Sequence, residues 1–439
     1  MRNFSFKTIL IGLIFFSGVI TYGQEKLSLT EEQAIEIGLK NSNMLHASLM
    51  KVLNAQAKLK EANSIRLPSL KLSAGYRRLS AVDPFSITTP LGTFNISPSI
   101  LDNYSTQLTL LQPLFTGFRL SSNTELNEQL ANASNEDYNK DKNELVYNIK
   151  NAYWSFFKAE QFKKVMDEIV AQINAHAIDA KNLMNVGMLT ENDILKFDVQ
   201  LSNVMYQQIE AENSVKMAST ALCSLLKLPL ETKIEIASGV NLVDVKYEEL
   251  DILLDYAFNH RPEIKSASLR IKASEAGVTL AQSSWYPQVS LYADFYYSKP
   301  NQRIMPTRNQ FDETWDAGVN LSMNLWDWMT TAHQTEQAEA QLAQAADGLE
   351  LTKDGVTLEV TQNFLTFNLA KKKTEIAALA IKQATENMRV TTDKFKSGLA
   401  TSAEMIDSET ALLSAKTNYT TSIVDYELAK AKLDKSIGK

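Results

Sequence analysis

The strongest constraint on the fold of this 439-residue chain is an internal duplication. Residues 43–76 match residues 262–295 at a constant offset of about 219 positions, and residues 187–222 match residues 398–433 at an offset of about 211. Both copies run in the same order. Solenoid repeats span only about 20 to 50 residues, so each copy must be a unit of several structural elements.

The N-terminal segment predicts export. Arg2 and Lys7 precede an apolar run from Ile9 to Ile20, and the small residue Gly23 follows, which is the order of a secretory signal peptide. The run of about 12 apolar residues is too short for a membrane-spanning helix, which needs about 20. We therefore expect residues 1–23 to be a signal peptide rather than a membrane anchor.

Composition limits the partners and the chemistry. The chain has 44 basic and 51 acidic residues, and loss of the signal peptide leaves a net charge of about -9, which argues against a nucleic-acid partner. The single cysteine, Cys223, excludes a disulfide framework. The histidines lack the spacing of metal ligands, and the sequence has no glycine-rich phosphate loop and no nucleophile elbow. We expect neither an enzyme nor a cofactor.

Most of the mature chain has the periodicity of long helices. Apolar and small residues recur in alternating steps of four and three from Leu145 to Met184, and more loosely from Val356 to Phe395. This is a heptad seam, which is typical of coiled coils. Residues 118–184 contain neither proline nor glycine, so one helix there would be roughly 100 Å long.

Between the helices the period changes to two. Apolar and polar side chains alternate from Val289 to Tyr297 and from Trp315 to Met323, and shorter stretches of the first copy do the same. These segments predict strands with one apolar and one polar face, of the length of transmembrane β-strands. The proline-containing loops at residues 83–98 and 299–306 would be exposed tips. A soluble sheet packed on helices is the alternative, but no nearby segment offers an apolar layer to cover it.

Each copy therefore contains a β-hairpin followed by long helices. The first unit spans residues 24–230, with a hairpin at about 68–115 and helices at about 117–228; the second spans 231–439, with a hairpin at about 287–326 and helices at about 330–437. Membrane strands must close into a barrel because unpaired edges cannot face lipid. Two hairpins supply only four strands, so the chain must oligomerise. Three copies make a twelve-stranded barrel with room for a lumen, whereas the eight strands of a dimer would be filled by their own side chains.

The duplicated order resembles the TolC family of outer-membrane efflux proteins. The order comprises a helix, a strand opened by Leu67-Pro68-Ser69-Leu70, a strand end at Gln112-Pro113-Leu114-Phe115-Thr116-Gly117, a long helix and a glycine-containing turn. The resemblance covers essentially the whole mature chain.

This resemblance implies a mainly α fold with some β structure, in which a homotrimeric transmembrane β-barrel continues into a long coiled-coil α-helical barrel. The strands would face outer-membrane lipid and the helices would cross the periplasm. The protein would be a passive exit duct for an inner-membrane efflux or secretion pump, joined to it by a periplasmic adaptor. The alternative is a periplasmic coiled-coil adaptor or structural protein without a pore, and the twin hairpins favour the duct.

The two helix-to-helix turns, at residues 185–193 and 397–407, are the candidate functional site. Gly187 and Gly398 suit the left-handed conformation that ends a helix, and the threonines three residues later, Thr190 and Thr401, suit the cap that opens the next helix. The family resemblance implies that these turns form the periplasmic end of the duct, where the adaptor would bind and the lumen would narrow.

The segment from Phe395 to Asp407 resembles the gating segment of the family. Phe395 matches an aromatic tip residue, and Glu404 and Asp407 match two acidic positions, one helical turn apart, that line the constriction. Asp193 matches an acidic partner in the other turn. The two carboxylates of the second turn could instead be solvated side chains of an ordinary helix.

The chain departs from the family pattern at Ala400. The best-known pattern has an arginine at this position, which bonds to the acidic partner and holds the closed state. That latch cannot form here. Lys196, the repeat equivalent of Asp407, is a candidate substitute for the missing cation.

Overall fold

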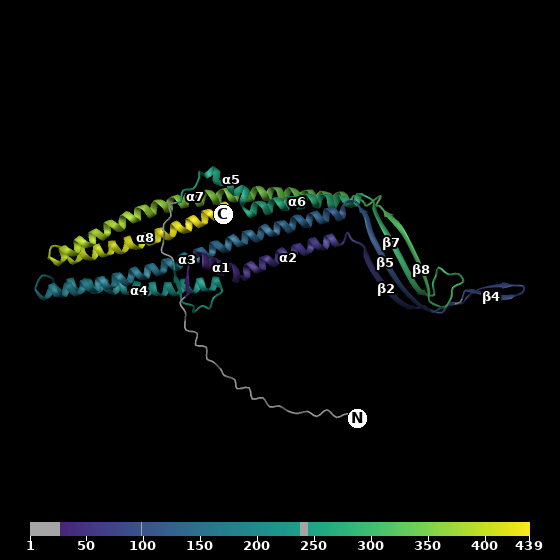
Figure 1. Ribbon diagram of the computed structural model, residues 1–439, viewed down its shortest axis with the longest axis horizontal. Coiled ribbons are helices and arrows are strands. Elements are labelled where there is room, and N and C mark those ends of the chain that lie inside the picture. Colours follow the sequence, from purple (N-terminus) through teal and green to yellow (C-terminus); the bar gives the residue numbers. More distant parts are fainter. Residues whose placement is uncertain (1–26, 98, 238–244) are drawn as a thin grey trace, which may run out of the picture.

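The computed structural model describes residues 27–97, 99–237 and 245–439 of the chain. The predicted signal peptide lies outside these described residues. The chain is a long, gently bent rod, with helices along most of its length and a sheet at one end (Figure 1).

The helices occur twice, in the same order and with matching lengths. The pairs are α1 (Glu31–Asn41) and α5 (Leu250–His260), with 11 residues each; α2 (Asn43–Ser64) and α6 (Pro262–Gln282), with 22 and 21; α3 (Arg119–Asn185) and α7 (Thr330–Lys396), with 67 each; and α4 (Glu191–Leu226) and α8 (Ser402–Ile437), with 36 each. At 1.5 Å per residue the two longest helices are about 100 Å long. The tandem repeat of long helices predicted from the sequence is therefore confirmed.

The main sheet is antiparallel and contains four strands. These are β2 (Ser69–Arg78), β5 (Asp102–Thr116), β7 (Gln288–Lys299) and β8 (Asp312–Ser322), which lie side by side in the order β2-β5-β7-β8. The register aligns Leu72 with Leu108, Leu108 with Phe295, and Phe295 with Trp315. Because side chains alternate between faces, one face carries apolar rows and the other carries polar rows, and the four predicted strands are confirmed.

The loop between β2 and β5 departs from the sequence prediction. It contains a separate hairpin, β3 (Phe85–Thr89) paired with β4 (Gly92–Ser97), which projects beyond the main sheet (Figure 1). Prolines stand before β3 and within its turn, at Pro84 and Pro90, and they mark this segment as a loop. The residues between them nevertheless alternate and pair, because neither proline occupies a strand position.

Elsewhere the helices lie in rows. Near the sheet, α3 packs between α2 and α6, and α6 packs against α7; toward the far end, α3 packs between α4 and α8, and α8 packs against α7. A short parallel pair, β1 (Leu27–Leu29) and β6 (Ile234–Ile236), braces the middle of the rod. None of the helices in the described part of the chain is both long and apolar enough to cross a membrane.

Each copy of the repeat has its own hydrophobic core, and the two cores are equivalent. The first joins α1, α3 and α4 through residues such as Ile149, Tyr153 and Leu222, and the second joins α5, α7 and α8 through residues such as Phe367 and Leu433. Each fully buried side chain of this size contributes about 1.5 to 3 kcal/mol. These cores hold each helical hairpin, α3–α4 and α7–α8, together. A third cluster, which includes Ile194, Met388 and Met405, joins the two hairpins and so positions the turns at the far end.

Candidate functional site

The turn between α3 and α4 has the geometry that the sequence predicts. Gly187 has a φ of +80°, its N–H donates to the carbonyl of Met184 at 2.8 Å, and the N–H of Met188 donates to the carbonyl of Leu183 at 2.9 Å. These two bonds form a Schellman motif, which satisfies the last carbonyls of α3. The left-handed conformation strains any residue with a Cβ, which explains the glycine.

The turn between α7 and α8 repeats this geometry. Gly398 has a φ of +70°, its N–H donates to the carbonyl of Phe395 at 3.0 Å, and the N–H of Leu399 donates to that of Lys394 at 2.8 Å. A Cβ added to Gly398 would lie 2.5 Å from the terminal methyl of Met188, so the two turns touch. Both turns are therefore closed by backbone hydrogen bonds, and they sit next to each other at the end of the rod.

Each turn is followed by a reciprocal cap. Thr190 Oγ1 accepts from the N–H of Asp193 at 3.4 Å, while Asp193 Oδ2 accepts from the N–H of Thr190 at 3.1 Å. Thr401 and Glu404 make the same exchange at 3.2 and 2.7 Å. These capping boxes begin α4 and α8.

The caps also set the charge of the acidic side chains. The hydroxyl and then the backbone N–H of Thr190 lower the pKa of Asp193, and the backbone N–H and then the hydroxyl of Thr401 lower the pKa of Glu404. Both carboxylates are thus ionised at neutral pH. Negative charge is favourable at a helix N-terminus, so these residues serve the fold whatever else they do.

Phe395 does not line a surface, and its predicted place at the constriction has to be corrected. Its side chain is 1% exposed, and its ring packs against Phe197 of α4 with centroids 5.7 Å apart. Residues of both helical hairpins surround it, among them Ile194, Met388 and Met405. The heptad seam turns this ring inward, because Phe395 follows Met388 by seven residues. Phe395 therefore joins the two turns from inside.

Among the described residues, the remaining predicted charged residues make no ion pair between the two helical hairpins. Lys196 Nζ lies 3.3 Å from Asp193 Oδ1 on the same helix, so in one chain it forms no bridge between the turns. Asp407 is exposed one turn after Glu404 on α8. Ala400 packs at the edge of the apolar cluster around Phe395. The structure therefore brings the two turns together through apolar contacts, whereas their charged residues lie outside that cluster.

The structure contains a buried pair of ionisable residues near the turns, on α3 and α8, that was not predicted from the sequence. His176 of α3 and Glu409 of α8 are 7% and 1% exposed, and Nε2 of the imidazole lies 3.7 Å from Oε1 of the carboxyl. Within the described residues neither side chain has a hydrogen-bond partner. Burial raises the pKa of Glu409 to about 7 and lowers the pKa of His176. The pair joins the first helical hairpin to the second.

The sequence does contain a signal for this pair. Glu409 follows Met405 by four residues and precedes Leu412 by three, so it occupies a seam position that is otherwise apolar. Its repeat equivalent, Asp198, is exposed. A carboxylate in a heptad seam is unusual enough to mark a buried ionisable group, and this spacing could have identified it.

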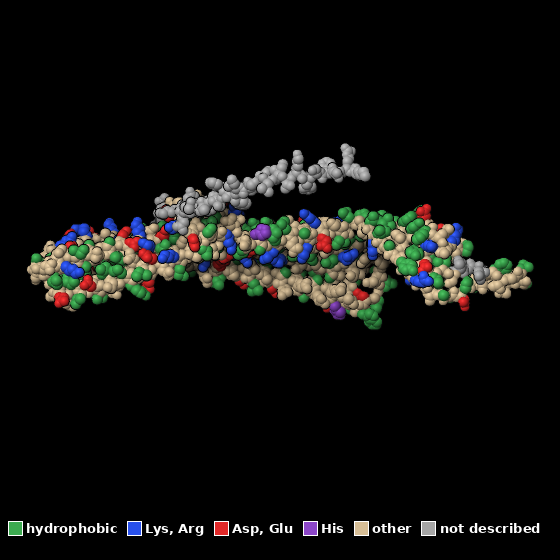
Figure 2. All heavy atoms as spheres, turned by 90° about the horizontal axis from the view of Figure 1, so that it is seen from below, with side chains coloured by type: hydrophobic (Ala, Val, Ile, Leu, Met, Phe, Trp, Pro, Cys, Tyr) green, Lys and Arg blue, Asp and Glu red, His purple; other side chains and the backbone are tan. Residues whose placement is uncertain are grey.

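At the opposite end of the rod, the apolar face of the sheet is uncovered. Leu72, Trp315 and Val319 are 68%, 75% and 63% exposed, whereas polar neighbours such as Asp316 are partly covered. Figure 2 shows hydrophobic side chains gathered over this end of the molecule. Trp326 and Trp328 are also exposed, where β8 leads back to the helices. This inverted pattern is that of strands in lipid with an aromatic girdle.

Comparisons with known proteins agree with this arrangement. A family model described as "Outer membrane efflux protein" matches residues 34–226 and 253–439. The chain is similar to the outer membrane protein TolC of Vibrio cholerae, with 22% identity over 386 residues, covering 86% of this chain and 83% of that protein. It is also similar to the alkaline protease secretion protein AprF of Pseudomonas aeruginosa, with 23% identity over 425 residues, covering 93% and 85%.

Solved structures show the same fold. The outer membrane protein VceC of Vibrio cholerae has a TM-score of 0.76 at 17% identity, covering 93% of this chain and 96% of that one. The CmeC outer membrane channel of Campylobacter jejuni has a TM-score of 0.77 at 16% identity, covering 100% and 94%. The TolC-like fold expected from the sequence is confirmed, with strands in the outer membrane and helices in the periplasm. Since the family model matches most of the chain, this protein belongs to the outer membrane efflux protein family.

Proposed function

We propose that three copies of this chain form a passive duct, through which a pump of the inner membrane expels its cargo across the periplasm and the outer membrane. The cargo would pass along the polar face of the sheet and between the long helices. A periplasmic adaptor would dock on the turns that contain Gly187 and Gly398.

The observation that carries this proposal is that, within the described part of one chain, the sheet and the rows of helices each begin and end with an element that has a neighbour on one side only. In the sheet, β2 and β8 are end strands, each with one strand neighbour among the described residues. Unpaired backbone groups at such edges cannot face lipid, because each would cost several kcal/mol. An uncovered apolar face beside two free edges therefore requires further copies to complete the sheet.

The helical rows point to the same conclusion. At one end of the row, α7 exposes Leu351, Leu358 and Leu365 at seven-residue intervals, on the side opposite its buried seam. At the other end, α4 exposes Ile209 and Met217. An exposed apolar stripe with heptad spacing is the surface of a coiled coil that lacks its partner. We infer that α7 of one copy packs against α4 and α2 of the next.

Strand number favours three copies. Two chains would supply eight strands, a barrel whose interior is filled by side chains, whereas three supply twelve and leave a lumen. The polar rows of the sheet suit the lining of such a lumen, and the apolar rows suit lipid. In a periplasmic coiled-coil adaptor without a pore, this apolar face of the sheet would be exposed to water.

The partners follow from the position of the turns. They lie at the end of the rod opposite the sheet (Figure 1), which is the end that would face the inner membrane. Their hydrogen-bonded backbone and exposed glycines would offer a surface to helices of an adaptor. The relative AprF is described as an alkaline protease secretion protein, which fits a duct that serves a separate pump.

Fractionation and conductance test this function together. The protein should appear in the outer-membrane fraction as a trimer that resists mild heating in detergent, and the purified trimer should conduct ions in a planar lipid bilayer. A monomer in the periplasmic fraction would support the adaptor alternative. Trimers that never conduct, including after deletion of both helix-to-helix turns, would rule out the duct.

A further inference from the structure

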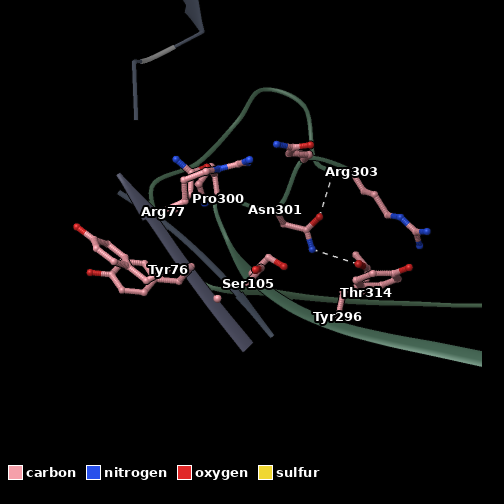
Figure 3. Close-up of a pocket in the computed structure, with 13 residues that line it drawn as sticks. Tyr76, Arg77, Ser105, Tyr296, Pro300, Asn301, Arg303 and Thr314 are labelled. Carbon is pink, nitrogen blue, oxygen red and sulfur yellow. Dashed lines mark hydrogen bonds between the residues drawn. The ribbon is translucent and has the colours of Figure 1, made fainter. Parts of the chain in front are cut away.

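The loop between β7 and β8 folds over the polar face of the sheet, although its sequence predicts an exposed tip. Asn301 is only 4% exposed. Its Nδ2 donates to the carbonyl of Asp312 and to Oγ1 of Thr314, both at 3.2 Å, and its Oδ1 accepts from the N–H of Arg303 at 3.0 Å (Figure 3). The amide of Asn301 thus fixes the start of the loop against β8.

Arg303 extends this contact further onto the sheet. Its guanidinium forms an ion pair with Asp316 and lies 4.9 Å from the ring centroid of Tyr296. Asp316 of β8 pairs with Asp294 of β7 in the register, so the two lie on the same face of the sheet. The next pair, Phe295 and Trp315, points to the opposite, apolar face. Arg303 is therefore held on the polar face by an ion pair and a cation–π contact.

The folded loop borders an open cavity that spans the width of the sheet. The cavity has a volume of about 580 Å³, and Figure 3 shows residues that line it. It lies at the end of the sheet away from the helices, because its lining residues stand at that end of the strand register. All four strands contribute lining residues, including Arg77 of β2, Ser105 of β5, Ser298 of β7 and Thr314 of β8. The loop thus hangs over the polar face rather than projecting from the strand ends.

This inference rests on the proposed function, in which the polar face lines the lumen and the helices lie in the periplasm. We propose that the β7–β8 loop forms a constriction at the outer mouth of the duct, held inward by Arg303, and limits the size of solutes that pass between the lumen and the cell exterior. Three copies of the loop would converge on the axis. This constriction is separate from the turns at the periplasmic end, which lie beyond about 100 Å of helix.

A cysteine deeper in the lumen reports on passage through this mouth. Asn320 lies on the polar face of β8, four residues beyond Asp316 toward the helices. Asn320→Cys would be treated on intact cells with maleimides attached to polyethylene glycol of increasing size. The parent protein without Asn320→Cys is the negative control, because its one cysteine, Cys223, is buried and should not react. In this background a small maleimide should react and the large ones should be excluded.

Adding Arg303→Ala should let the larger reagents react about tenfold faster, because loss of the ion pair and the cation–π contact raises the population of the displaced loop. Replacing residues 302–310 by a short glycine-serine linker should have at least the same effect. The matched control is Arg308→Ala, which removes the same charge from an exposed position of the same loop and should leave the rates unchanged.

A charge exchange separates the ion pair from a general loosening of the loop. Arg303→Glu should behave like Arg303→Ala, because it sets a second carboxylate against Asp316, and the double variant Arg303→Asp with Asp316→Arg should restore exclusion. Each variant must remain a trimer in the outer membrane. Equal rates in all these variants would overturn the outer constriction while leaving the duct intact. If Asn320→Cys is labelled only after the outer membrane is broken even when residues 302–310 are replaced by the linker, the duct itself is contradicted.

Discussion

Glu409 and His176 are two ionisable residues placed where a coiled coil normally has apolar ones. Burial raises the pKa of Glu409 to about 7 from its ordinary value of 4.5, so the folded protein favours the protonated carboxyl. The resulting stability is fully present below pH 4.5 and is lost as the pH rises through about 7. The pH dependence of the His176 contribution to stability is opposite. Burial lowers the pKa of His176, so its contribution to stability is lost as the pH falls.

We therefore predict that Glu409→Gln stabilises the protein at pH 8 by up to about 3 kcal/mol per chain, and changes its stability little at pH 5. Thermal unfolding followed by circular dichroism at the two pH values measures this. The control is Asp198→Asn at the equivalent exposed position, which should be neutral at both. An equal shift at pH 5 and pH 8 would mean that Glu409 is not protonated in the folded chain.

Glu404 and Asp407 are three residues apart and share one face of α8. In a trimer they would place about six carboxylates around the periplasmic end of the lumen. Their negative charge should concentrate cations there, so the purified trimer in a planar bilayer should be cation-selective and should be blocked from the periplasmic side by multivalent cations. The double variant Glu404→Gln with Asp407→Asn should lose most of this selectivity and most of this block. The new glutamine side chain can still accept from the N–H of Thr401, so assembly should persist. A block as strong as that of the parent would show that these carboxylates do not face the lumen.

At the scale of single residues, the sequence predicts backbone roles better than side-chain directions. Both capping boxes follow from a threonine with an acidic residue three positions later, and both left-handed glycines follow from the turn. The heptad seam predicts that Phe395 is packed, whereas its place in the gating segment came from the family resemblance. The seam does not show that the ring would meet Phe197 of the other helical hairpin. The ion pair of Arg303 joins a loop to a strand 13 residues away and leaves no local pattern.

At the scale of elements, the long helices are the most predictable part. Helix α3 has neither proline nor glycine in its 67 residues, and its seam runs from Leu145 to Met184, so helix propensity and hydrophobic pattern agree. The β3–β4 hairpin does not follow from the sequence, because prolines flank it and divide it. The loop at residues 299–306 has the polar composition of an exposed tip, yet its polar groups are used against the polar face of β8.

The turn of the β3–β4 hairpin gives a test of topology. An epitope inserted after Thr89 should be recognised by antibodies on intact cells, because the hairpin projects from the end of the rod opposite the helix-to-helix turns (Figure 1). The matched insertion after Gly187 should be recognised only after the outer membrane is breached. Recognition in the reverse order would invert the orientation of the chain.

At the scale of the whole molecule, assembly depends on the stripe that α7 exposes. Leu365→Asp should prevent trimer formation, since an unpaired carboxylate in each coiled-coil contact would cost several kcal/mol, on the order of 3. Thr366→Asp places the same charge on the next residue, which is exposed but off the stripe, and should leave the trimer intact. Heat-resistant bands in gels of outer-membrane fractions distinguish the two. If both variants assemble equally, α7 does not lie at the contact between copies.

The need for further copies of the chain is predictable from the sequence, because four strands cannot close into a barrel. The number of copies rests on the size of the lumen rather than on any contact within one chain. The structure adds where the copies would meet, since β2, α2 and α4 end the rows on one side and β8 and α7 end them on the other.

Native mass spectrometry of the protein extracted from outer membranes in detergent tests the shared duct most directly. We predict one assembly of three chains, released as monomers only on denaturation. An assembly of one, two or four chains from the same membranes would contradict it, because the strand number, the lumen and the convergence of the outer loops all depend on three.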